Sequence, residues 1–194
     1  GRDVLRQLLE ATSHLHANNA VHKDLKLENV MLDVSPAAVQ PRRGCKSPTG
    51  KCGRVVLIDF DTIEEWTPQT PASKDVVGTD QYIAQEAYSG NYSPMSDIFA
   101  IGVIAYRMLC GRFPFDEGLF DDEAGENWVG SPKMKQIRNR LKVAKINWDH
   151  PVFRESPQLQ DLVERMLAFE ELVRPSAAEA LQHPLFRDQW SPPS

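Results

Sequence analysis

The chain has 194 residues, of which 41% are hydrophobic, and its formal net charge at pH 7 is −5. A chain of this length buries roughly 70% of the surface that its unfolded form exposes, so we expect one globular unit with a substantial core. The negative charge gives no overall attraction to nucleic acid or anionic lipid, which argues against either as a partner. Three cysteines cannot all pair within the chain, and it does not open on a charged and then apolar leader, which favours a reducing, intracellular setting.

The first predicted element is a helix. Apolar residues recur on one face between Val4 and Leu15, and the pair Asn18-Asn19 breaks the pattern. Two short runs that favour β-structure follow, at residues 30–33 and 55–59. We expect these two runs to pair as a small β-hairpin with an oversized connecting loop.

The connection between the two strands carries several prolines and glycines, and residues 34–58 hold five bases and no acid. Structureless connections of this length are usually functional or disordered. We therefore expect a disordered, solvated insertion over residues 34–54, with a docking role as the alternative. Cys45 and Cys52 lie in this insertion, and their wide spacing without a nearby His favours free thiols over a zinc site.

The centre of the predicted fold is a later helix. The run from Ser93 to Leu109 begins with helix-starting residues and is apolar on every side, which is typical of a buried helix. Its most apolar part, residues 98–109, is shorter than the roughly 20 residues of a membrane helix, so we expect no membrane span. Helices at residues 157–167 and 177–182 close a chain that we expect to be mainly helical, of the α+β class.

An acidic segment precedes the closing helices. Residues 116–126 hold six acids and no base, a composition that also occurs in calcium sites. The acids lack the alternating spacing and the mid-loop glycine of an EF-hand. A solvated acidic loop is therefore the favoured interpretation.

Residues 22–29 place a carboxylate, a cation and an amide within one short segment. If the segment is extended, Asp24 and Lys26 point the same way and both face one reacting phosphoryl group. Asp59 ends the second β-rich run, and the hairpin would return it beside the strand that follows Asn29. Magnesium takes one or two protein oxygens and leaves the rest of its shell to water and phosphate, so these two side chains would suffice for a nucleotide-bound ion.

Three segments resemble motifs of the eukaryotic protein kinase family. Residues 22–29 resemble its catalytic loop, residues 59–61 its Asp-Phe-Gly magnesium motif, and residues 84–86 its Ala-Pro-Glu motif. The family also has an Asp early in the next long helix, a late Arg that pairs with the Glu of the third motif, and a terminal Leu-x-His-Pro segment. The matching positions here are Asp97, Arg174 with Glu86, and residues 181–184.

The resemblance implies a fold and a domain organisation. Residues 1–187 would form a kinase C-terminal lobe, helical with the small hairpin at the catalytic loop and the insertion at 34–54, and residues 188–194 would be a tail. The glycine-rich phosphate loop, the strand Lys and the helix Glu of the N-terminal lobe do not occur in the sequence, so this lobe is expected to be absent.

The resemblance also implies ATP and Mg²⁺ as cofactors and a protein Ser or Thr hydroxyl as the phosphate acceptor. Asp24 would accept or orient the proton of that hydroxyl, and Lys26 would steady the γ-phosphate of ATP. Asn29 and Asp59 would hold the magnesium ion. Met31 would lie against adenine, with an ordinary core methionine as the alternative.

Other residues would support these roles. Glu28 would contact a basic side chain of the substrate, with an unspecialised surface acid as the alternative. Thr79 lies in the segment from Asp59 to Glu86, whose hydroxyls are candidates for phosphorylation, and it is expected to be structural or to contact substrate. The structural residues would be the following: His22 and Phe60 in an internal stack, Asp97, and the pair of Glu86 with Arg174.

The subgroup follows from finer matches. Lys26, together with Gly78-Thr79 ahead of Tyr82, is similar to serine/threonine kinases, and the Leu-x-His-Pro ending is similar to the calcium/calmodulin-dependent group.

Two departures from the family's motifs favour a second interpretation, a protein that keeps the kinase fold but transfers no phosphate. Lys23 replaces the usual Arg and offers a point charge in place of a planar fork, and Asp61 replaces Gly and adds a negative charge beside Asp59. The hypotheses are therefore an active serine/threonine kinase and a pseudokinase that serves as a scaffold.

Overall fold

The computed structural model describes residues 1–41 and 51–187, and most of this part of the chain is helical or irregular. Antiparallel two-stranded ladders make up its β structure. The α-helices are α1 (Arg2–Ala17), α2 (Pro94–Cys110), α3 (Pro132–Val143), α4 (Pro151–Glu155), α5 (Pro157–Met166) and α6 (Ala177–Leu181). The strands are β1 (Ala20–Val21), β2 (Val30–Asp33), β3 (Gln40–Pro41), β4 (Lys51–Cys52), β5 (Arg54–Leu57) and β6 (Glu64–Glu65).

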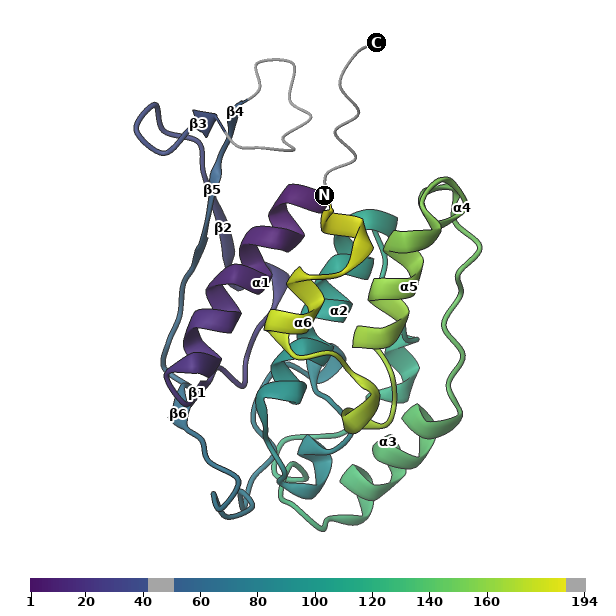
Figure 1. Ribbon diagram of the computed structural model, residues 1–194. Helices are drawn as coiled ribbons and strands as arrows, with labels where there is room; N and C mark the ends of the chain where they lie inside the picture. Colours follow the sequence, from purple (N-terminus) through teal and green to yellow (C-terminus); the bar gives the residue numbers. More distant parts are fainter. Residues whose placement is uncertain (42–50, 188–194) are drawn as a thin grey trace.

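Helix α2 forms the centre of the core. Its residues from Ser96 to Tyr106 are all buried, as expected for a helix that is apolar on every side. The Ser93 side chain caps its first turn, and Gly111 ends it in the left-handed conformation at φ 69°. Helix α1 packs against α2 and α6, and α5 packs on α2 (Figure 1). Among the described residues, no helix combines the length and the apolar character needed to cross a bilayer.

The hairpin of β2 and β5 is held to α1 by one side chain. The two strands pair antiparallel, with Val30 opposite Leu57. The buried Gln7 of α1 donates to the carbonyl of Gly53 at 3.0 Å and accepts from the amide of Val55 at 3.0 Å. The second strand was expected to continue to residue 59, but Asp59 has φ 64°, a left-handed conformation that cannot continue a strand.

The long connection between β2 and β5 differs from the expected insertion. Strands β3 and β4 pair antiparallel within it, and Arg54 already belongs to β5. Because β2 and β5 run side by side, they bring the two ends of the connection together and favour a paired stem. The expectation for Cys45 falls on residues 42–50, and that for the tail on residues 188–194; both lie outside the described residues.

Helix α3 was not predicted. Its sequence signal is a Ser131 cap, which accepts from the amide of Met134 at 3.1 Å, followed by a proline in the first turn. Met134, Ile137 and Leu141 are its buried residues, at a spacing that places them on one face. Arg140 of this helix donates to Asp121 at 2.6 Å, so the acidic loop is partly paired with α3 and not solvated throughout.

Candidate active site

A buried carboxylate holds the turn that precedes Asp24. Asp97, in the first turn of α2, accepts from the backbone amides of His22 at 2.9 Å and Lys23 at 3.0 Å. His16 of α1 contacts the same carboxylate, with 2.9 Å between Nε2 and Oδ2. Lys23 has φ 70°, a conformation that L-residues rarely adopt, and the bonds to Asp97 stabilise it. The backbone is thus redirected at residue 23, immediately before Asp24.

Asp24, Lys26 and Thr79 form a hydrogen-bonded cluster. The Lys26 ammonium lies 2.7 Å from Oδ2 of Asp24, and the Thr79 hydroxyl donates to Oδ1 of Asp24 at 2.9 Å. Lys26 also donates to the Thr79 hydroxyl at 3.2 Å. The hydrogen bond that Lys26 donates to Asp24 outweighs burial and raises the pKa of Lys26. A carboxylate, a cation and an alcohol therefore meet at one point.

Asn29 lies directly before β2, and Asp59 lies just beyond the end of β5. The Asn29 amide donates to the carbonyl of Asp24 at 3.2 Å, which leaves its Oδ1 without a hydrogen-bond partner among the described residues. The amide of Ile58 donates to the carbonyl of Asn29 at 3.0 Å and so brings Asp59 next to this strand. Within residues 1–41 and 51–187 the Asp59 carboxylate has no hydrogen bond or ion pair, and the residue is exposed. Two oxygen groups are thus available, one just before β2 and one just beyond β5, and oxygen is the ligand type that magnesium takes.

The residues around Asn29 and Asp59 differ in burial: His22 lies inside the protein, whereas Met31 and Phe60 are exposed. His22 is fully buried, and its ring centroid lies 5.8 Å from that of Phe60. The Thr62 hydroxyl donates to the carbonyl of His22 at 2.7 Å. Met31 is 52% exposed, so the alternative of an ordinary core methionine is wrong. Met31 is the second residue of β2, after Val30, which lies opposite the buried Leu57. Because successive side chains of a strand point to opposite faces, Met31 points away from the core.

Glu28 is not a free surface acid. Its carboxylate accepts hydrogen bonds from the Arg107 guanidinium and, at 3.2 Å, from the Tyr82 hydroxyl. Burial acts to raise the pKa of Glu28, but the hydrogen bonds, led by that from Arg107, outweigh it and lower the pKa. Arg107 was not predicted as a site residue, because it is 79 residues away from Glu28 in the sequence and no local pattern joins the two.

Lys23 has an acidic partner that sequence reasoning also missed. Its ammonium pairs with Glu64 of β6 and lies 4.6 Å from the centroid of the Tyr92 ring. The Lys23 side chain is only 5% exposed, and burial raises the pKa of Tyr92 to about 12, so this phenol stays neutral. Strand β6 pairs with β1, directly before residue 22. The cation at position 23 is therefore matched by a carboxylate of the chain itself.

Replacing Glu64 with Gln is expected to loosen this segment. The Lys23 ammonium would keep its contact with the Tyr92 ring but lose its counter-charge. The backbone amide of Trp66, directly after β6, donates to the carbonyl of Asn19 at 2.7 Å, so its exchange rate measures the stability of this strand. We expect hydrogen exchange of the Trp66 amide to accelerate about two- to fivefold. Glu65→Gln is the matched control, since Glu65 is exposed and makes no ion pair in the described part of the chain. Equal exchange rates in the two variants would contradict the expectation.

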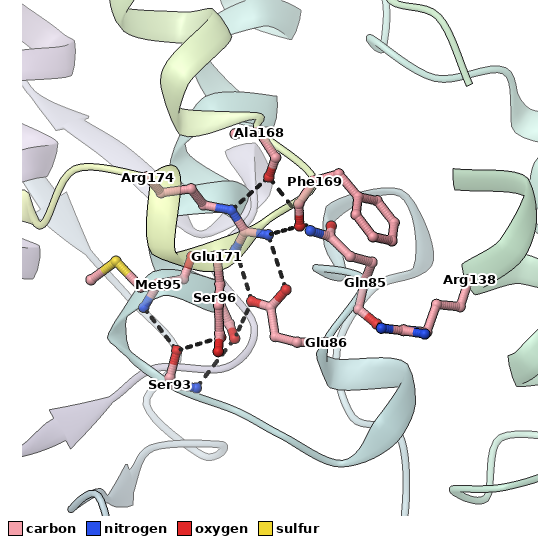
Figure 2. A network of polar contacts seen from close by, with 10 residues as sticks. All are labelled: Gln85, Glu86, Ser93, Met95, Ser96, Arg138, Ala168, Phe169, Glu171 and Arg174. Atoms are coloured by element: carbon pink, nitrogen blue, oxygen red, sulfur yellow. Dashed lines mark hydrogen bonds and ion pairs between the residues drawn. The ribbon is translucent and has the colours of Figure 1, made fainter. Parts of the chain in front are cut away.

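Glu86 and Arg174 form a second network, shown in Figure 2. Arg174 donates to the two carboxylate oxygens of Glu86 at 2.8 and 2.9 Å, and both residues are buried. The Ser96 hydroxyl donates to Glu86 at 2.9 Å. Gln85, which stands where the kinase motif has Pro, donates to the carbonyl of Ala168 at 3.4 Å, an acceptor that it shares with Arg174. The network joins the segment after Thr79 to the C-terminal part of the chain.

Comparisons with known proteins agree with these observations. The profile of the family described as protein kinase domain matches residues 1–186. Calcium-dependent protein kinase 4 of Plasmodium berghei (strain Anka) is 30% identical over 185 residues, which are 95% of this chain and 30% of that protein. Calcium/calmodulin-dependent protein kinase type IV of Mus musculus is 32% identical over 184 residues, 94% of this chain and 34% of that protein. Serine/threonine-protein kinase PAK mbt of Drosophila melanogaster is 30% identical over 192 residues, 98% and 25% respectively.

The chain thus spans between a quarter and about a third of the length of these relatives. The family match, in contrast, covers nearly all of the chain. It includes the segments at 22–29, 59–61 and 84–86 in the order expected for the family. The chain belongs to the eukaryotic protein kinase family.

Proposed function

We propose that this chain is the catalytic-loop and substrate-binding lobe of a protein serine/threonine kinase, which transfers the γ-phosphate of ATP to a protein hydroxyl. The cluster of Asp24, Lys26 and Thr79 carries the proposal. Asp24 accepts a hydrogen bond from an alcohol at 2.9 Å, within the range that a general base requires. A cation contacts both groups, as is needed where negative charge accumulates during phosphate transfer. Thr79 shows that an alcohol fits against this carboxylate.

The cofactors would be ATP and Mg²⁺, and the free oxygens support this proposal. Oδ1 of Asn29 and the carboxylate of Asp59 would hold the ion, which, when bound, neutralises charge on the phosphates. Lys26 would contribute its positive charge to the γ-phosphate, since lysine is protonated at neutral pH and the hydrogen bond to Asp24 raises its pKa further. Asp24 would orient the acceptor hydroxyl and take its proton. The role of the chain would be mainly positioning and electrostatic stabilisation.

An exposed apolar surface supports a place for adenine and for a second lobe. Ile58 and Phe60, the chain neighbours of Asp59, are 39% and 50% exposed, and Met31 and Leu32 on β2 are 52% and 50% exposed. Large apolar side chains grouped on a surface mark a binding or packing site. We propose that Met31 contacts adenine and that the N-terminal kinase lobe covers the rest. We expect residues 1–194 alone to transfer phosphate negligibly, because half of the nucleotide site would be absent.

A pseudokinase that serves as a scaffold is the second candidate. Asp61 is exposed and adds a negative charge two residues from Asp59, which opposes nucleotide binding. Lys23 is already paired with Glu64 and is not available to a phosphate on the segment from 59 to 86. Neither feature removes Asp24, Lys26, Asn29 or Asp59, on which the proposed phosphate transfer depends.

Removal of magnesium tests the proposal. The longest natural protein that contains residues 1–194 should transfer labelled phosphate from ATP to a generic Ser/Thr protein substrate, and chelation of Mg²⁺ should abolish the transfer. Hydrolysis of the product should release phosphoserine and phosphothreonine and no phosphotyrosine. Absence of transfer with Mg²⁺ present, together with intact folding by circular dichroism, would favour the scaffold. Transfer that persists after chelation would contradict the roles of Asn29 and Asp59.

A further inference from the structure

The acid expected to recognise basic substrates is already paired with a cation of the same chain. Arg107 lies in the last turn of α2, and its guanidinium donates to Oε1 of Glu28 and, at 2.5 Å, to the Tyr82 hydroxyl. Its carbon Cζ lies 4.5 Å from the centroid of the Phe113 ring, which packs edge-on against Tyr82. Glu28 therefore belongs to a group of four side chains, with Arg107, Tyr82 and Phe113, that hydrogen bonds and ring contacts hold in place.

The pairing changes the charge that a substrate meets at this place. Glu28 follows Asp24 by four residues, and its side chain is 53% exposed, so a bound substrate can reach it. Arg107 is 29% exposed, and its Nε and Nη2 groups have no hydrogen-bond partner among the described residues. A basic side chain of a substrate would have to displace Arg107 from Glu28 or approach its positive charge. An uncharged or acidic side chain would meet no such obstacle.

We propose that Arg107 is a specificity-determining residue that removes selection for a basic side chain at the substrate position lying over Glu28. The proposal rests on the proposed kinase function and adds a substrate class to it. Substrates would carry an uncharged or acidic residue at that position. Other acids near Thr79, such as Asp80, would act at other positions of the substrate, so the effect is confined to one position.

The matched variants are Arg107→Met and Arg107→Lys in the longest natural protein that contains the chain. Met keeps an unbranched stem against Phe113 and removes the charge, whereas Lys keeps the charge. Arg154→Met, at a side chain 69% exposed on α4, controls for the loss of one arginine elsewhere. Each protein is assayed with peptide pools in which Arg, Ala or Glu is placed in turn at every position on either side of one acceptor Ser.

For each peptide position we compare kcat/KM for the peptide with Arg there to kcat/KM for the peptide with Ala there. We expect Arg107→Met to raise this ratio about tenfold at one position of the peptide. Arg107→Lys and Arg154→Met should show the profile of the unmodified protein. Adding Glu28→Gln to Arg107→Met should cancel the gain, because the acid exposed by the first change is then gone. Identical positional profiles for the unmodified protein and Arg107→Met would overturn the proposal.

A second readout separates this proposal from the kinase function. Binding of the same peptides, measured by fluorescence anisotropy, does not require phosphate transfer. A protein that transfers no phosphate but binds Arg peptides about tenfold more tightly as Arg107→Met would refute the kinase function and support the role of Arg107. Active proteins whose binding and kinetic ratios are both insensitive to residue 107 would refute the role of Arg107 alone.

Discussion

Asp24→Asn is expected to lower the turnover number for phosphate transfer by about 10²- to 10⁴-fold, the range that general-base catalysis contributes. Asn has nearly the same size and can still accept the Thr79 hydrogen bond that Oδ1 of Asp24 accepts at 2.9 Å. It cannot take a proton, and it offers Lys26 no counter-charge. The variant therefore removes the chemistry and retains the shape of the site.

The measurement combines kinetics with a titration. The pKa of Lys26 is raised, first of all by its hydrogen bond to Asp24, so Asp24→Asn should shift that pKa down toward its ordinary value in an NMR titration. Asp149→Asn is the matched control, because Asp149 is 81% exposed and, in the described part of the chain, its carboxylate pairs only with the surface residue Arg154. We expect the control to keep full activity. A turnover number for Asp24→Asn within threefold of the control would show that Asp24 is not the base.

The parts of the fold that the sequence predicted are those with local causes. Helix α1 follows from apolar periodicity, and α2 follows from its helix-starting residues and its continuous apolar run; the structure begins and ends both within a few residues of the predicted bounds. Membership of the kinase family followed from motif order and is confirmed by the match over residues 1–186. The end of β5 was misplaced because the left-handed conformation of Asp59 depends on its surroundings.

The missed contacts join residues that are distant in sequence. Arg107 meets Glu28, and Glu64 meets Lys23, across separations of 79 and 41 residues. Neither Arg107 nor Glu64 lies in one of the recognised motifs, so a single sequence carries no pattern that would pair them with Glu28 and Lys23. Helix α3 was missed for another reason: its apolar face has three well-spaced residues among many charges, and its capping Ser131 went unrecognised. A search for Ser-Pro at a helix start would have found it.

Arg174→Met is expected to lower the free energy of unfolding by about 3–5 kcal/mol, the cost of breaking a buried ion pair from one side. The Arg174 side chain is 0% exposed and lies 5.0 Å from the Phe99 ring centroid. Besides Glu86 it donates to three backbone carbonyls, those of Ala168 and Met95 at 2.8 Å and Phe169 at 3.3 Å (Figure 2). The substitution would leave the Glu86 charge buried, and among the described residues only the Ser96 hydroxyl would still donate to its carboxylate.

Urea unfolding followed by circular dichroism measures this loss, and two further variants identify its cause. Arg165→Met removes an arginine from an exposed ion pair with Asp161 and should cost at most about 1 kcal/mol. Adding Glu86→Leu to Arg174→Met removes the stranded charge and should recover part of the loss. Recovery should be incomplete, because the carbonyls of Ala168, Met95 and Phe169 still lack the donor that Arg174 provides. A cost for Arg174→Met no greater than that for Arg165→Met would show that the network does not stabilise the fold.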